Sequence, residues 1–357
     1  VMTSANLSGF PLEIDNDYAY MRLKDIVDAW LDHDRDILIR CDDSVVRVID
    51  NKPVYIRRSR GYAPEAIKVS KKLPMILACG SHLKNTVAIS RDQDIFLSQH
   101  IGDLENIETH LMLNETVTHL EKIFEISPQY VACDRHPDFY STRYAFDEAK
   151  TRKIQSFQLQ HHASHIAVGM AELGRTEETL GIALDGVGLG DDAQIWGSEL
   201  LFIDAKGQHK RLGHIKELPL PGGDVAAREP QRMGASVLVL LNRTSEIKNR
   251  FPTLQQAEHF DLLVKNPRLS PLTSSLGRWF DAVSSLLGLC YIQHDEARAA
   301  MLLETLGSKE KGENLYHLMP IDEMGVIDPL PFIDQMLTVL NEKNVSQWAA
   351  NFHVTLA

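Results

Sequence analysis

Short apolar runs and longer stretches of helical periodicity alternate along this chain of 357 residues. Apolar runs that are rich in valine and isoleucine, or bounded by turn residues, predict strands. These runs are residues 36–40, 44–48, 55–58, 75–79, 86–90, 94–99, 129–133, 154–159, 179–184 and 195–202. Apolar residues spaced three and four apart predict helices at residues 23–30, 107–126 and 161–173, and the chain is mainly helical after residue 200.

The order of these elements predicts an α/β fold in three parts. From residue 75 the order βββαβαβ resembles one lobe of the ribonuclease-H-like ATPases, the superfamily that includes actin and the sugar kinases. We therefore expect a two-lobed actin-like domain, with lobe I at residues 71–205 and lobe II at residues 206–357. Residues 1–70 are expected to be the closing part of a different α/β domain, because an irregular, lysine-rich stretch ends it near residue 70.

Charge and cysteine content narrow the possible functions. The net charge of −12, from 37 basic and 49 acidic residues, argues against a broad nucleic-acid-binding face. The four cysteines form no CxxC pair, so the sequence indicates neither a zinc finger nor a disulfide framework. We expect a reduced, cytoplasmic setting. No apolar stretch reaches membrane-spanning length, so no membrane partner is expected.

A pair of histidines one helical turn apart is the first candidate for chemistry. His161 and His165 project from one face of a predicted helix, with Cβ atoms roughly 6 Å apart. The strand predicted at residues 179–184 delivers Asp185 at its carboxyl end, where α/β sheets place ligand-binding groups. Two imidazoles and a carboxylate suit iron or zinc, and such an ion can act on a carbonyl as a Lewis acid. A histidine pair alone would equally fit an exposed helix start.

The glycine-rich stretch after Asp185 is the second candidate. Gly186, Gly188 and Gly190 stand at alternate positions, which lets backbone N–H groups approach phosphate oxygens closely. This pattern after a strand predicts the phosphate hairpin of an ATPase. A plain tight turn is the alternative.

Two further turns could serve the same nucleotide. Lys84, in the first hairpin of lobe I, could face a phosphate. Gly222, Gly223 and Asp224 could hold the nucleoside end, with Asp224 accepting hydrogen bonds from ribose hydroxyls. Either turn taken alone would be ordinary.

The first segment offers polar groups of its own. Ser4 and Asn6 lie on an N-terminal turn that suits the phosphates and ribose of a nucleotide. Arg58 and Ser59 belong to an arginine-rich stretch, and guanidinium groups recognise phosphate and carboxylate bidentately. Structural ion pairs with neighbouring aspartates explain part of this stretch equally well.

Taken together, these motifs resemble the HypF family of hydrogenase-maturation carbamoyltransferases. The series spans almost the whole chain and keeps one order, which makes a chance match improbable. Its members are Thr-Ser-Ala-Asn-Leu-Ser-Gly (3–9), His-Asp-Arg-Asp-Ile (33–37), Asp-Asp-Ser-Val-Val-Arg (42–47), Arg-Arg-Ser-Arg-Gly-Tyr (57–62), Leu-Lys-Asn-Thr (83–86), Leu-Ser-Gln-His-Ile-Gly-Asp-Leu (97–104), Asp-Arg-His-Pro (134–137), His161 to His165, Leu-Asp-Gly (184–186), Trp-Gly (196–197) with Glu199, Leu-Pro-Gly-Gly-Asp (220–224), and Ser-Leu-Gly-Arg (275–278) with Phe-Asp-Ala (280–282).

The resemblance implies an ATP-dependent carbamoyltransferase. A YrdC-like domain, represented here by residues 1–70, would use magnesium–ATP to convert carbamate, derived from carbamoyl phosphate, into carbamoyl-adenylate. The actin-like domain would transfer the carbamoyl group to the C-terminal cysteine of a partner, HypE, for cyanide ligand synthesis. By position, Ser4, Asn6, Arg58 and Ser59 would bind the adenylate. His161, His165 and Asp185 would bind iron or zinc, which would polarise the carbamoyl carbonyl.

The chain also departs from the family pattern. We find no counterpart of the family's acylphosphatase domain, its zinc-finger region or its late metal-binding aspartate, so we expect a fragment that binds metal weakly. Residues 295–300 read Asp-Glu-Ala-Arg-Ala-Ala where the family has Tyr-Glu-Gly-Gln/Glu-Ala-Ala. Two alternatives stay open: a related carbamoyltransferase acting on a small molecule or tRNA, and a non-catalytic truncated scaffold.

Overall fold

The computed structural model describes residues 4–357 as two compact units. The first unit runs to Gln160 and includes Gly169–Thr176, and the second comprises His161–Val168 and Glu177–Ala357. Each unit has a sheet and a hydrophobic core of its own. The mixed α/β class is confirmed, and the predicted border between residues 205 and 206 lies within the second unit.

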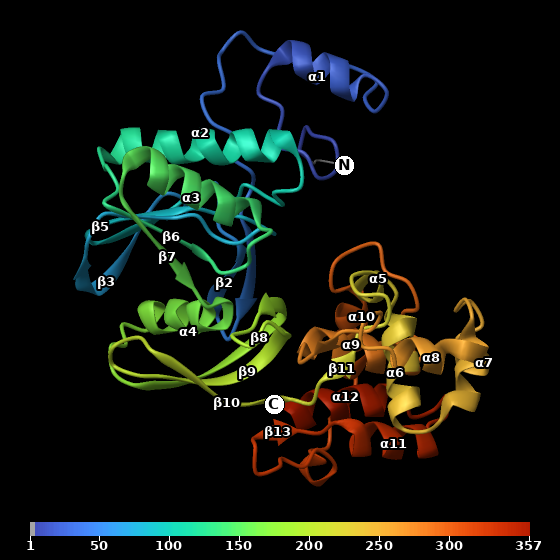
Figure 1. The fold of residues 1–357 in the computed structure, drawn as a ribbon. Coiled ribbons are helices and arrows are strands. Elements are labelled where there is room, and N and C mark those ends of the chain that lie inside the picture. Colours follow the sequence, from blue (N-terminus) through green and yellow to red (C-terminus); the bar gives the residue numbers. More distant parts are fainter. Residues whose placement is uncertain (1–3) are drawn as a thin grey trace. The chain divides into compact units, whose positions relative to one another are not determined.

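The first unit is built on a five-stranded sheet with the order β3-β5-β4-β6-β7. Helices α2 and α3 cover one face of this sheet (Figure 1). β4, β6 and β7 are parallel, whereas β3 and β4 pair antiparallel with β5. The elements are β3 (Ala66–Leu73), β4 (Ile76–Ala78), β5 (Ala88–Leu97), α2 (Ile107–Phe124), β6 (Tyr130–Asp134), α3 (Tyr140–Arg152) and β7 (Gln155–Leu159).

Helix α2 illustrates how capping residues and apolar periodicity determine where a helix of this unit forms. Its N-cap is Asn106, whose side chain accepts a hydrogen bond from the Thr109 N–H, and it ends at Glu125 in the left-handed conformation. Leu113, Val117 and Leu120 follow helical spacing and are fully buried against the sheet. The helix predicted at residues 107–126 is therefore confirmed.

The segment before this sheet differs from expectation in two places. The helix predicted at residues 23–30 is wrong, because α1 (Asn16–Leu23) ends where it should begin and is capped by Asp15. Ile26 and Trp30 are exposed, so their periodicity marks no buried face. The strand predicted at residues 36–40 is also wrong. The strands predicted next are confirmed as the hairpin of β1 (Val45–Ile49) and β2 (Lys52–Arg57).

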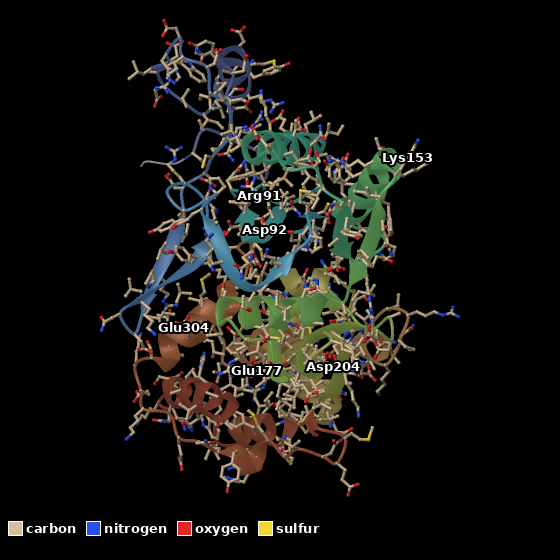
Figure 2. All side chains as sticks on the ribbon, turned by 90° about the vertical axis from the view of Figure 1, so that its left-hand side faces the viewer. Arg91, Asp92, Lys153, Glu177, Asp204 and Glu304 are labelled. Atoms are coloured by element: carbon tan, nitrogen blue, oxygen red, sulfur yellow. The ribbon has the colours of Figure 1, made fainter. Side chains whose placement is uncertain are left out.

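Strand β5 replaces two predicted strands, at residues 86–90 and 94–99. Arg91 and Asp92, labelled in Figure 2, lie between the two predicted strands. Asp92 does have a positive φ of 54° and pairs with Leu73 where the register with β3 shifts. A bulge absorbs the irregularity, and the strand continues.

The second unit combines a six-stranded sheet with a cluster of helices. The sheet has the order β11-β12-β9-β10-β13, and β8 also pairs with β9. Its helices α6 and α9 carry much of the core, including the fully buried Trp279, whose indole N–H donates to the Lys216 carbonyl. The elements are α4 (His161–Glu172), β8 (Thr179–Leu189), β9 (Ile195–Ile203), β10 (His209–Ile215), β11 (Leu218–Pro219), α5 (Val225–Arg228), α6 (Pro230–Leu240), α7 (Ile247–Arg250), α8 (Phe260–Val264), β12 (Leu272–Thr273), α9 (Leu276–Leu286), α10 (Arg298–Gly307), β13 (Val326–Ile327), α11 (Leu330–Val339), α12 (Val345–Leu356) and 3-10 turns at Thr244–Glu246, Ala257–His259 and Tyr316–Leu318.

Strand β8 is longer than predicted. Its pairing with β9 is interrupted between Leu184 and Gly188 and then resumes to Leu189. Asp185 therefore lies at a break within the strand, and not at its end as predicted. Across residues 4–357 we find no helix that is both long and apolar enough to cross a membrane.

Candidate functional site

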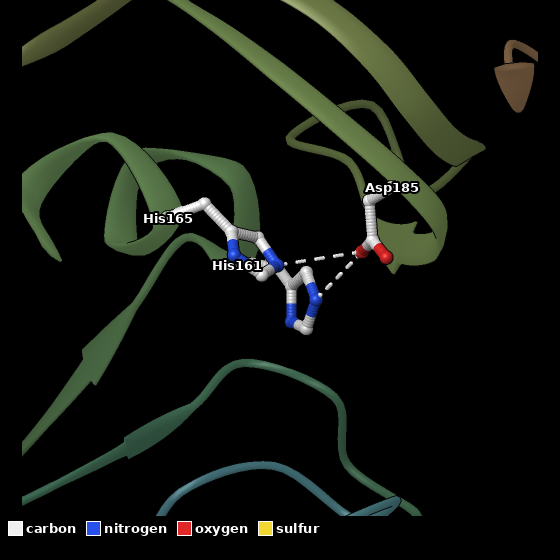
Figure 3. Close-up of side chains that lie close together, drawn as sticks. All are labelled: His161, His165 and Asp185. Atoms are coloured by element: carbon white, nitrogen blue, oxygen red, sulfur yellow. Dashed lines mark hydrogen bonds and ion pairs between the residues drawn. The ribbon is translucent and has the colours of Figure 1, made fainter. Parts of the chain in front are cut away.

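His161, His165 and Asp185 come together in the second unit, as predicted (Figure 3). The two histidines lie on the first turns of α4, and Asp185 lies at the break in β8. The Nε2 atoms of His161 and His165 are 3.0 and 3.5 Å from the same Asp185 oxygen, Oδ2. The centres of the two imidazole rings are 5.0 Å apart, and the ring planes are steeply inclined to each other. The Nε2 atom of each ring faces the carboxylate.

The environment keeps Asp185 ionised. Burial alone would raise the pKa of its carboxyl. Contacts from His161 and His165 and a hydrogen bond from the Gly186 N–H to Oδ1 outweigh burial and hold this pKa well below its ordinary value. The cluster therefore presents two imidazoles beside a permanent negative charge at neutral pH.

This donor set fits a divalent metal ion. One ligand atom from each of the three residues lies within 4.8 Å of the others. Ligand atoms about 2.0–2.1 Å from one zinc ion lie roughly 2.8–3.4 Å apart at octahedral to tetrahedral angles, close to the two nitrogen–oxygen distances of 3.0 and 3.5 Å found here. His165 is about half exposed, which leaves an open side for a further ligand.

A third histidine, His162, adjoins the cluster. It is fully buried, and its Nε2 lies 4.0 Å from Oδ2 of Asp185. Burial, reinforced by the neighbouring His161, lowers the pKa of His162 to about 4, so it is neutral at physiological pH. The centre of its ring lies 6.0 Å from that of the Trp196 ring, so His162 lies against both Asp185 and Trp196. The sequence identified the motif but not this role.

Close approach of β8 to α4 explains two glycines of the strand. A Cβ added at Gly188 would lie 2.6 Å from ring atoms of both His161 and His162. A Cβ added at Gly181 would lie 2.6 Å from the Ile166 side chain. Only glycine at these positions lets the strand pass directly beneath the helix.

We expect Gly188→Ala to disturb the cluster without touching any of its ligand atoms. The added methyl group must displace the His161 ring, so metal affinity should fall at least about tenfold, as when a group that orients a ligand is lost. Gly169→Ala is the matched control, because Gly169 lies in α4, the helix that carries His161, and a Cβ there has nothing within 4 Å. Equal affinity of the two variants, measured by competition with a chelator, would contradict this role of Gly188.

A buried ion pair supports the strand beside the cluster. Glu199 in β9 is fully buried and pairs with Arg211 at 2.6 Å. Its other carboxylate oxygen accepts hydrogen bonds from the N–H groups of Gly197 and Ser198 and from Ser274. The Arg211 guanidinium lies 4.2 Å from the centre of the Trp196 ring. This network ties β9 and β10 together under Trp196.

An open, mainly apolar pocket of about 290 Å³ adjoins Asp185. Its other lining residues are Leu184, Gly186, Leu276, Gly277, Phe280 and Ala300. Ala297, at the position where the family that the sequence resembles has glycine, is the N-cap of α10 with a φ of +58°, three residues before Ala300 of the pocket lining. A reacting group could reach the cluster from this side.

The remaining glycines predicted to bind nucleotide have different surroundings. A Cβ added at Gly190 would lie 2.3 Å from the Trp196 indole nitrogen, whereas Gly186 has open space around it. Gly222 and Gly223 have positive φ values of 84° and 60°, and Asp224 follows them as the N-cap of α5. This last turn is held by hydrogen bonds from the Gly222 N–H to Leu269 and from the Gly223 N–H to Leu220.

The predicted nucleotide-binding residues of the first unit divide into two groups. Ser4, Asn6 and Lys84 line one cavity of about 520 Å³, together with Arg57. Arg58 and Ser59 are not among its lining residues. Ser59 is fully buried, and Arg58 donates a hydrogen bond to the Glu65 carbonyl. Strand β2 ends at Arg57, and Arg58 lies just beyond it, a distinction that the arginine-rich sequence did not reveal.

Three family models match consecutive parts of the chain. A model described as the Kae1-like domain of HypF matches residues 71–172, and one described as the second subdomain of a Kae1-like carbamoyltransferase domain matches residues 181–357. Residues 1–59 match the Sua5, YciO and YrdC model, described as telomere recombination.

Named relatives agree with these matches. Carbamoyltransferase HypF2 of Cupriavidus necator is 46% identical over 387 residues, which cover 100% of this chain and 47% of the relative. A carbamoyltransferase HypF homolog of the same organism is 40% identical, with 79% of this chain and 74% of the relative covered. The crystal structure of full-length HypF in a phosphate- and nucleotide-bound form superposes with a TM-score of 0.87 at 36% identity, covering 99% of this chain and 56% of that one. The chain thus spans about half the length of the first of these relatives.

Proposed function

Since this chain belongs to the HypF family of carbamoyltransferases, we propose that it takes part in carbamoyl transfer during hydrogenase maturation. In this proposal, residues 1–70 contribute to forming carbamoyl-adenylate from ATP and carbamoyl phosphate. The second unit passes the carbamoyl group to the C-terminal cysteine of a HypE-type partner. The observation that carries the transfer step is the convergence of His161, His165 and Asp185 beside an open pocket.

The three side chains have distinct tasks in the transfer. His161 and Asp185 are mostly buried and form the fixed side of the cluster, while the more exposed His165 faces its open side. An iron or zinc ion held there would polarise the carbamoyl carbonyl as a Lewis acid. The ionised Asp185 also places a negative charge near the reacting centre. This charge attracts a metal ion or another cation and repels a free anion.

The apolar pocket suits the acceptor side of the reaction. Leu184, Leu276 and Phe280 line this open pocket with apolar surface, against which the acyl group would lie. In the transfer, the acceptor sulfur bonds to the carbamoyl carbon, the bond from that carbon to the adenylate oxygen breaks, and AMP leaves with the electron pair. The cysteine thiol first loses its proton to water, and the resulting thiolate attacks.

The test separates transfer from adenylate formation. The full chain is loaded with zinc or, without oxygen, with ferrous iron, and is given carbamoyl-adenylate and a peptide ending in the partner's cysteine. Mass spectrometry should show one carbamoyl group on the peptide sulfur, and none with a peptide in which serine replaces that cysteine. Carbamoylation of an added sugar or tRNA instead would favour the related transferases, and no transfer to any acceptor would refute the proposal.

A further inference from the structure

Lys84 lines a cavity together with residues that are distant from it in the sequence. The cavity of about 520 Å³ lies within the first unit and has two walls. One wall comes from the segment before residue 60 and includes Ser4, Asn6 and Arg57. The other comes from two loops of the following sheet domain and includes Lys84 and His100. The family models divide the chain between these same walls.

Direct contacts join the two walls. Asn106 caps α2 with its side-chain oxygen and donates from its amide nitrogen to the Gly9 carbonyl. Arg22 bridges Glu13 and Glu108, and Arg40 pairs with Glu115. Because these contacts run along the first half of α2, the cavity is an internal feature of one packed unit.

Hydrogen bonds of Asn85 hold the loop that carries Lys84. Asn85 is almost fully buried, and its amide nitrogen donates to the carbonyls of Cys79 and Ser81. Its backbone exchanges hydrogen bonds with Gly102 and Ile101 of the second loop. The cavity wall is therefore set before any ligand arrives.

Lys84 itself has a backbone conformation that lysine rarely adopts. Its φ is +48°, and its N–H donates to the Asp103 carboxylate at 2.7 Å. A non-glycine residue in the left-handed region is strained, and such residues concentrate at ligand-binding sites. Glycine or asparagine would serve a plain turn here better than lysine does.

The charges of the lining indicate the ligand. Two cations, Arg57 and Lys84, face three carboxylates, Asp42, Asp43 and Asp103. Arg57 pairs with Asp42 at 2.5 Å. Burial, together with the positive Arg57, lowers the pKa of His100, which therefore stays neutral at physiological pH. A bare anion would meet more negative than positive charge, whereas magnesium bound to a polyphosphate uses both carboxylates and cations.

We propose that Lys84 binds the phosphates of the magnesium–nucleotide that is converted into the adenylate, in one cavity with Ser4, Asn6 and Arg57. The inference rests on the proposed function and reassigns Lys84 from a nucleotide beside the metal cluster to the adenylate-forming site. In that step a carbamate oxygen bonds to the α-phosphorus, and the bond from this phosphorus to the bridging oxygen breaks. Pyrophosphate leaves with the electron pair, and Lys84 stabilises its growing negative charge.

The first experiment compares two half-reactions in the full chain. Lys84→Met should lower carbamate-dependent exchange of pyrophosphate into ATP at least about tenfold, because a charge-assisted contact is lost. Lys84→Arg should restore part of the activity. Transfer from supplied carbamoyl-adenylate and the metal content should not change. Lys72→Met, an exposed lysine of the same domain, is the control. Loss of transfer with normal exchange would overturn the proposal while leaving the proposed function intact.

The second experiment does not depend on turnover. Magnesium–ATP should protect the Lys84 amine from an acylating reagent, as read by peptide mass spectrometry, while Lys72 reacts equally with and without nucleotide. In an Arg57→Met variant this protection should weaken at least about tenfold in ATP concentration, since both cations hold one ligand. Unaltered protection in that variant, or none in the unsubstituted chain, would overturn the proposal. If neither half-reaction occurs in the unsubstituted chain, the proposed function fails, and the protection result still decides the role of Lys84.

Discussion

His161→Ala should lose the bound metal. This imidazole makes the shortest contact to Asp185, at 3.0 Å, and its side chain is mostly buried, so neither water nor another side chain replaces it easily. Loss of a group that only orients a ligand weakens metal binding by about 10–100-fold, so removing the ligand itself should weaken it at least about a hundredfold. Metal content after dialysis against a mild chelator, measured by elemental mass spectrometry, gives the answer.

Two further histidine variants test whether the loss of metal is specific to the cluster. His165→Ala should act in the same direction, and His317→Ala, an exposed histidine far along the chain, should keep the full metal content. Carbamoyl transfer should fall in parallel with metal content across the series. A His161→Ala protein that retains metal and transfer would show that the three side chains form a hydrogen-bonded cluster without an ion.

The convergence of His161, His165 and Asp185 was predictable from sequence because its geometry is local. His161 and His165 need only one helical turn to align, and Asp185 follows on the very next strand. In the first unit, α2 was predictable from its apolar periodicity and its Asn106 cap, and β6 from its short apolar run. Where the apolar residues stay exposed, as at Ile26 and Trp30, the same periodicity predicted a helix that does not exist.

The surroundings of the cluster were not predictable, because they depend on packing between distant segments. The glycine-rich stretch suggested phosphate binding, yet Gly188 and Gly190 are explained by the rings of His161 and Trp196 that lie against them. The cavity partners Ser4, Asn6 and Arg57 precede Lys84 by 27 to 80 residues, and Asp103 follows it by 19, so no spacing rule could join them. The residue types could be read from the sequence, but only the fold shows that Lys84 and Arg57 line one cavity.

Arg211→Leu should produce the largest loss of stability. It leaves the Glu199 carboxylate fully buried with its charge uncompensated, although the backbone N–H groups and Ser274 still donate to it. Removing one partner of a buried ion pair typically lowers the free energy of unfolding by about 3–5 kcal/mol. The lost stacking of the guanidinium on Trp196 adds to this. Urea unfolding followed by hydrogen exchange of the β9 peptide reports this unit specifically.

The double variant Arg211→Leu/Glu199→Gln identifies the cause. It removes the orphaned charge while keeping an amide that can accept from Gly197 and Ser198, so it should be more stable than Arg211→Leu alone. Lys248→Met breaks a solvent-exposed pair with Glu258 and should leave the unfolding curve unchanged. If Arg211→Leu lost no more than Lys248→Met, the pair would not hold β9 and β10 together. The position of His162 would then depend on its packing against Trp196 alone.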